Sequence, residues 1–174
     1  MSDTWSRLAP MRFGALFALL TLLFGFGLGA AFGAAEDSLK GHLKEEGKAA
    51  LASKYGGDEA KAKKVTDKAW VYFKRAHLHA NGLGTSALAL IMLLSFFAAG
   101  DRLKSILALA SGVGGLGYSI YWLFAGLRAP GMGSTGAAKE SLEWLAIPSS
   151  GLVILSLLAI IVLLIKSMTS RSAS

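Results

Sequence analysis

Four long stretches of this sequence contain no lysine, arginine, aspartate or glutamate. They cover residues 13–35, 76–100, 105–127 and 144–165, so the 18 basic and 11 acidic residues all lie outside them. A charged side chain at the centre of a bilayer costs about 2.5–3.5 kcal/mol, and about 20 apolar residues cross the hydrocarbon core as a helix. We therefore predict an all-α protein, a four-transmembrane-helix bundle that forms one integral membrane domain over residues 1–174.

The first predicted span raises the question of a cleaved secretory signal. Such a signal has an apolar region of about 7–15 residues, and residues 13–35 form a longer one. The length favours an uncleaved anchor, while Ala34-Ala35 before Glu36 leaves cleavage open as the alternative.

Residues 36–75 form a charged insert with ten basic and seven acidic residues. Ser38 can cap a helix that Gly56-Gly57 ends, and Asp58-Glu59 can begin a second helix that meets no breaker before Gly82. We predict a charged helical hairpin between the first and second spans, standing on the membrane.

The remaining connections are short. Residues 101–104 alone join the second and third spans, which predicts two antiparallel neighbours. Residues 128–143 join the third and fourth, and Pro130 with Gly131, Gly133 and Gly136 predicts a loop without regular structure there.

The basic residues of the short connections predict the orientation. Six lie on the side of the termini and two on the other, where the insert adds ten more. With the insert discounted, the positive-inside rule places both termini in the cytoplasm. Counting the insert reverses the orientation, and both readings stay open.

Composition excludes several classes of function. The chain has no cysteine, so it has no disulfide and no thiolate metal site. The net charge is +7, but no run of lysine and arginine is longer than two residues. This pattern favours the lipid bilayer over nucleic acid as a partner. No paired carboxylates, Ser-His-Asp order or H-E-x-x-H spacing is present, so we expect no catalytic residues.

Small residues recur inside the predicted spans. Gly25, Gly29 and Gly33 repeat every four residues, and Gly112 and Gly115 lie in the third span. Such stripes let helices pack closely, either within one chain or between copies of it. Residues 112–117 also match G-x-G-x-x-G, but no strand precedes them, so we interpret them as helix packing.

The mouth of the second span carries His77, His79 and Asn81, which include two of the three histidines and the only asparagine. Histidine there can ligate a metal or haem, relay protons or bond a quinone. In the alternative reading the rings bond water, loop carbonyls or Glu143. At about 100° per residue the two rings point about 200° apart. We expect one to face the bundle and the other lipid, the insert or a partner.

Further polar groups are expected near these histidines. The topology brings Tyr121 and Glu143 to the same side, where they and His77 and Asn81 could line a pocket, while Met132 could supply a second haem ligand. The candidate cofactor-binding residues are therefore His77, His79, Asn81, Tyr121, Met132 and Glu143.

The motif A-H-x-H-x-N-x-L-G, residues 76–84, resembles one in a family of small four-helix bacterial membrane proteins. That family is described as similar to the haem-bearing catalytic subunit of haem–copper oxidases. The resemblance implies a bacterial inner membrane location and a haem b linked through His77 or His79. The charged insert departs from the family's plan.

Two hypotheses of function follow. The first is a non-catalytic accessory or oligomerising subunit of a larger, respiratory membrane complex. It rests on the small residues along the helix faces and on the lack of a complete set of catalytic residues. The second is an electron carrier that binds haem b or a quinone at His77 and His79.

Overall fold

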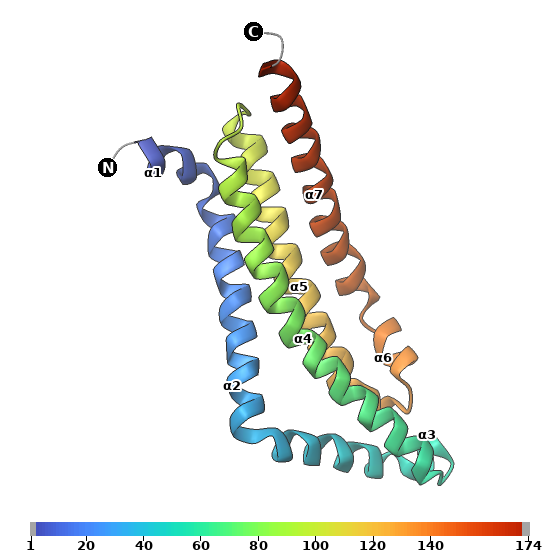
Figure 1. Cartoon of the computed structure of the whole chain (residues 1–174). Helices are drawn as coiled ribbons and strands as arrows, with labels where there is room; N and C mark the ends of the chain where they lie inside the picture. The colour runs from blue at the N-terminus through green and yellow to red at the C-terminus, as the bar shows by residue number, and fades with distance from the viewer. Residues whose placement is uncertain (1–2, 172–174) are drawn as a thin grey trace.

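The computed structural model describes residues 3–171, and every regular element in that part is a helix (Figure 1). The elements are α1 (Asp3–Leu8), the short 3-10 helix η1 (Ala9–Met11), α2 (Arg12–Ala49), α3 (Leu51–Tyr55), α4 (Glu59–Leu94), α5 (Asp101–Met132), α6 (Thr135–Glu140) and α7 (Glu143–Arg171). The all-α prediction is confirmed for these residues. Four helices, corresponding to α2, α4, α5 and α7, are long and apolar enough to cross a membrane, which indicates a multi-pass membrane protein.

Helix α2 bends sharply at Ala35, whose φ of −141° and ψ of 27° are not helical. The bend falls at the last residue of the first predicted span. Beyond it, residues 36–49 form a charged arm that turns across one end of the bundle (Figure 1). The helix resumes directly after the bend, so Ser38 lies within its first turn and the prediction that Ser38 caps a new helix is wrong.

The chain reverses direction after α3. Gly56 and Gly57 have φ values of +63° and +83°, a region that glycine reaches without a Cβ penalty. The Asp58 side chain then accepts a hydrogen bond of 2.9 Å from the backbone N–H of Lys61 and caps α4. As predicted, α4 begins at this point and runs without interruption into the second span, ending at Leu94.

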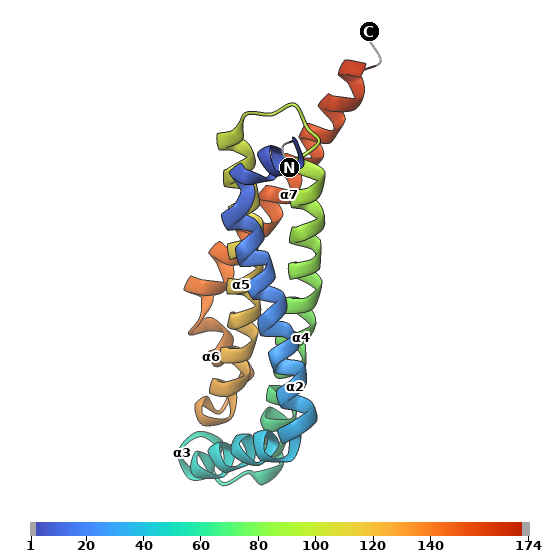
Figure 2. The ribbon, with the colours of Figure 1, turned by 90° about the vertical axis from the view of Figure 1, so that its left-hand side faces the viewer.

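Helices α2, α4 and α5 all contact one another, and α7 packs mainly on α5 (Figure 2). Their close approach depends on small residues. A Cβ on Gly112 of α5 would lie 2.6 Å from the carbonyl oxygen of Gly14 in α2. Near this crossing, buried Ala18, Ala87 and Ala108 form the core together with larger side chains, including Ile91, Leu94 and Ile160.

The connection between the second and third spans differs from the prediction. Helix α4 ends at Leu94, residues 95–100 make the turn, and α5 begins at Asp101. Residues 101–104 are therefore the first turn of a helix, where the negative charge of Asp101 favours the helix N-terminus. The two helices are still neighbours in contact.

Residues 128–143 are mostly helical, so the prediction of an irregular loop is wrong. Helix α5 continues through Pro130 to Met132 and ends at Gly133, with φ of +73°; α6 follows. Ala129 and Pro130 are buried, and tertiary packing here outweighs the low helix propensity of proline.

Candidate functional site

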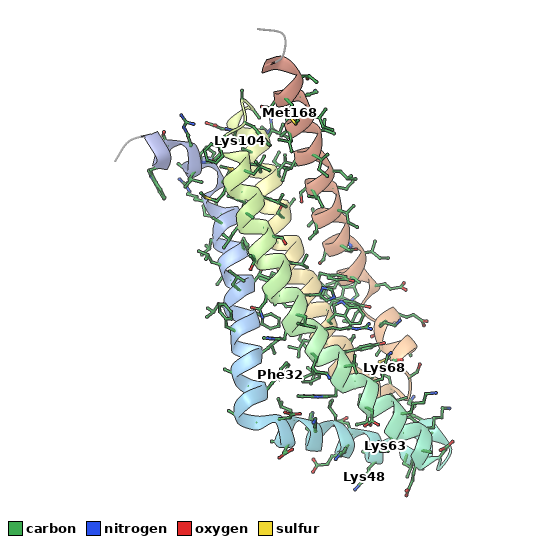
Figure 3. The ribbon with its side chains drawn as sticks, in the orientation of Figure 1. Phe32, Lys48, Lys63, Lys68, Lys104 and Met168 are labelled. Carbon is green, nitrogen blue, oxygen red and sulfur yellow. The ribbon has the colours of Figure 1, made fainter. Side chains whose placement is uncertain are left out.

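His77 packs against the backbone of α2. Its Nδ1 lies 2.8 Å from the carbonyl oxygen of Gly25. A carbonyl oxygen only accepts, so Nδ1 carries the proton and donates this hydrogen bond. The imidazole ring also meets the ring of Phe32 edge-on, with centroids 5.8 Å apart. Figure 3 shows Phe32 beside the bend of α2, on the side facing α4.

Asn81 lies one helical turn after His77 and shares its face, as the periodicity predicts. Its Nδ2 donates to the carbonyl oxygen of His77 at 3.1 Å and lies 3.5 Å from His77 Nε2. The amide oxygen Oδ1 is buried and has no hydrogen-bond partner within residues 3–171. One polar atom in this α2–α4 contact is thus left unsatisfied.

Of the three α2 glycines that repeat every four residues, two receive these side chains. A Cβ on Gly25 would lie 2.7 Å from Asn81 Oδ1, and a Cβ on Gly29 would lie 2.9 Å from His77 Cε1. Gly33 differs, since no other helix among the described residues comes within 4 Å of its Cβ position. It sits exposed, two residues before the bend. In α5, a Cβ on Gly115 would lie 3.3 Å from Leu83 Cβ.

His79 points to the opposite side of α4 and packs against α5. Its ring is stacked on Trp122, with centroids 5.9 Å apart and planes at 18°, and meets Tyr118 edge-on at 5.1 Å. The prediction that the rings diverge is correct, but the prediction that one of them faces lipid, the insert or a partner is wrong. Both side chains are half-buried, because α4 packs against α2 and α5 on different faces.

An aromatic cluster surrounds His79. Tyr72 meets Trp122 edge-on at 4.9 Å, and the Arg75 guanidinium lies 4.8 Å from the Trp122 ring centroid. Sequence reasoning missed Arg75 and Trp122 as partners of His79. The spacing of Tyr72, Arg75 and His79 along one face of α4 was the available signal. Trp122 Nε1 is buried without a hydrogen-bond partner in the described residues.

The other candidate residues are dispersed. Tyr121 belongs to the aromatic cluster, Met132 packs in another apolar cluster with Leu43 and Phe73, and Glu143 is exposed in the first turn of α7. The residues predicted to line one pocket face different helices, since His77 and Asn81 face α2 while Tyr121 packs with Tyr72 and Trp122.

The residues present do not fit a haem held by the two histidines. Their rings diverge, and the His77 imidazole itself fills the notch opposite Gly29. The remaining histidine, His42, lies exposed on the charged arm of α2. Across residues 3–171 no group of three or more His, Asp or Glu side chains is placed to hold a metal ion.

Comparison of the chain with protein-family models, with curated proteins and with solved structures finds no match.

Proposed function

We propose that this chain is a non-catalytic membrane protein that serves as an accessory or oligomerising subunit of a larger membrane complex. The observation that carries the proposal is the exposure of α7. Of the 18 residues in its most apolar stretch, only 11% are buried within the chain, against 44% for the corresponding stretch of α5. Leu155 on α7, for example, is 66% exposed. A second membrane protein could pack along this helix.

The state of the histidines supports a structural rather than a catalytic role. The His77 Nδ1–H is held by Gly25, and His79 is packed between aromatic rings. A general acid or base needs a proton within reach of a substrate, whereas these two rings are engaged with the backbone and the aromatic side chains of neighbouring helices.

The proposed location is the inner membrane of a bacterium, within a respiratory assembly. In this arrangement both termini are cytoplasmic and residues 36–75 stand at the opposite surface as a charged helical hairpin. The positions of the described chain ends support a common side for the termini, since both lie at one end of the bundle (Figure 1).

The test is the size of the protein as it leaves the membrane. After extraction in a mild detergent, the chain should migrate in a complex much heavier than 18.2 kDa. A photo-crosslinking residue in place of Leu155 should capture a membrane protein. The same residue in place of Ser156, which is buried against α5, should link only within the chain. A monodisperse monomer with no capture at position 155 would overturn the proposal.

A second candidate is an electron carrier that binds a quinone beside His79. One observation favours the quinone: the buried Nε1–H of Trp122 has no acceptor within residues 3–171, and a quinone carbonyl could supply one. An absorption spectrum before and after dithionite, with quinone analysis of the extract, tests it. A quinone signal that His79→Ala removes and His77→Ala retains would support this candidate, whereas an extract without quinone would dismiss it.

A further inference from the structure

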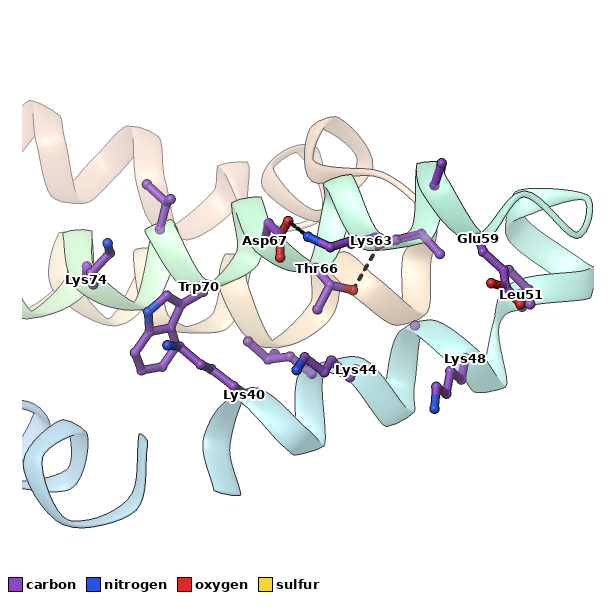
Figure 4. A pocket seen from close by; sticks show the side chains of 15 residues that line it. Lys40, Lys44, Lys48, Leu51, Glu59, Lys63, Thr66, Asp67, Trp70 and Lys74 are labelled. Atoms are coloured by element: carbon purple, nitrogen blue, oxygen red, sulfur yellow. Dashed lines mark hydrogen bonds and ion pairs between the residues drawn. The ribbon is translucent and has the colours of Figure 1, made fainter. Parts of the chain in front are cut away.

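A groove of about 1100 Å³ lies between the charged arm of α2 and the first four turns of α4 (Figure 4). Five lysines and two acids line it, together with apolar side chains and Trp70. Buried Leu43 and Ala62 contribute to the apolar lining. The groove therefore combines an apolar floor with an excess of positive charge.

Two of the five lysines already have acidic partners. Lys63 Nζ lies 2.6 Å from Asp67 Oδ2, and Lys40 pairs with Glu36. The other three, Lys44, Lys48 and Lys74, have no acid within 4 Å among the described residues. These three uncompensated ammonium groups are available to an anion.

The groove begins where the apolar helices end. Lys74 lies two residues before the charge-free stretch 76–100, and Lys40 lies five residues after the charge-free stretch 13–35. Trp70 stands between them, with its ring centroid 5.1 Å from Lys40 Nζ (Figure 4). Tryptophan and lysine at such a boundary are typical of the headgroup region of a bilayer.

We propose that this groove binds the headgroup of an anionic phospholipid from the membrane that the four helices cross. Basic clusters immediately beside a transmembrane helix attract anionic lipids, at about 1 kcal/mol for each lysine near the surface. The apolar floor and Trp70 would contact the glycerol region, Lys44 of the arm would meet the phosphate, and Lys48 and Lys74 would add to the positive potential along the groove. The lipid would then join the arm of α2 to α4.

The binding test uses the purified full chain in a neutral detergent. Dioleoyl phosphatidylglycerol, dioleoyl phosphatidylcholine and inorganic phosphate are titrated separately, and native mass spectrometry counts the bound molecules. Phosphatidylglycerol should bind in a one-to-one ratio and at least tenfold more tightly than phosphatidylcholine. Inorganic phosphate binding as tightly as phosphatidylglycerol would overturn the lipid assignment in favour of a free-anion site.

A matched pair of variants locates the site. Lys44→Gln, Lys48→Gln and Lys74→Gln together should weaken phosphatidylglycerol binding by roughly 100-fold. The control carries the same charge change on exposed lysines of α4 that do not line the groove, Lys61→Gln, Lys64→Gln and Lys68→Gln. It should bind within twofold of the unaltered chain. Equal losses in both variants would mean a diffuse charge effect and overturn the proposal.

A measurement on the unaltered chain is independent of how the triple variants fold. Brominated phosphatidylglycerol should quench tryptophan fluorescence more strongly than brominated phosphatidylcholine, and Trp70→Phe should remove that difference. A difference that persists in Trp70→Phe would place the lipid elsewhere. These outcomes do not depend on the size of the native complex, so this proposal can fail while the accessory role stands.

Discussion

The Nδ1–H of His77 donates a hydrogen bond of 2.8 Å to the carbonyl oxygen of Gly25. The bond joins α4 to the backbone of α2 and fixes the neutral imidazole as the Nδ1–H tautomer. It is reachable because Gly25 and Gly29 have no side chains, so the ring and the Asn81 amide occupy the space where two Cβ atoms would lie. The small residues of α2 and the polar residues of α4 form one packing unit.

Removing the imidazole should loosen the contact between α2 and α4. His77→Ala loses the hydrogen bond and leaves a cavity, so we expect the free energy of unfolding to fall by about 1–3 kcal/mol. Thermal unfolding in detergent measures it. The control is His42→Ala, because His42 is exposed on the charged arm. Equal stability of the two variants would contradict a structural role for His77.

A methyl group on Gly25 should have the same consequence from the other side of the contact. Its carbon would lie 2.7 Å from Asn81 Oδ1 and 3.0 Å from Ala80 Cβ, so Gly25→Ala should push the helices apart and cost about 1–3 kcal/mol. Gly33→Ala should be neutral or slightly stabilising, because its Cβ position is open and alanine favours helix. An equal loss of stability in Gly25→Ala and Gly33→Ala would contradict this difference between the two positions.

The attachment of α7 should depend on a hydrogen bond between serines. The Ser111 hydroxyl donates to Ser156 Oγ at 2.9 Å, and both side chains are buried. Ser156→Ala should lower stability by about 0.5–1.5 kcal/mol and increase crosslinking of α7 to neighbouring molecules. Ser150→Ala is the control, since Ser150 Oγ bonds only to carbonyls of its own helix. Unchanged stability and crosslinking in Ser156→Ala would contradict this attachment.

The connection between α3 and α5 should weaken at alkaline pH. The buried Tyr55 hydroxyl donates to the carbonyl oxygen of Pro130 at 2.7 Å, and burial raises the pKa of this phenol. The folded chain therefore retains the proton more tightly than the unfolded chain, whose tyrosine pKa is about 10. The contribution to stability is complete below that pH and is lost as pH rises through the raised pKa.

Hydrogen exchange of the α3 amides measures this effect. Protection should fall as the pH passes above about 10, and Tyr55→Phe should be less protected at neutral pH and lack the Tyr55-dependent fall. Ser53→Ala, on the exposed side of the same helix, should keep the behaviour of the unaltered chain. A Tyr55→Phe profile that matches the unaltered chain at every pH would rule out this role for the hydroxyl.

Local helix signals in the sequence were reliable where they agreed with packing. Asp58 capped α4 as expected, and Asn81 shared the face of His77. The local signals were wrong at Pro130, where burial kept α5 helical, and at Ser38, because the break in α2 lies three residues earlier, at Ala35. Propensity is a weak term that burial and neighbouring helices override.

For the candidate site, the sequence located the polar residues but not their partners. It identified His77 and His79 and the angle between them, because helical periodicity fixes both. It could not show that α4 packs against α2 and α5 on different faces, so it left one ring facing lipid. Arg75 and Trp122 were missed as partners of His79 because they lie 47 positions apart in the sequence, on two different helices, and meet only in the folded chain.

By itself, the sequence determined four apolar helices, since the cost of a buried charge fixes where the spans begin and end. The tertiary structure alone decided which faces meet. It separated Gly25 and Gly29 from Gly33, placed His79 on Trp122, and brought the lysines of the α2 arm beside those of α4 along one groove. Charge segregation acts on each segment independently, whereas helix contacts depend on the shapes of two surfaces at once.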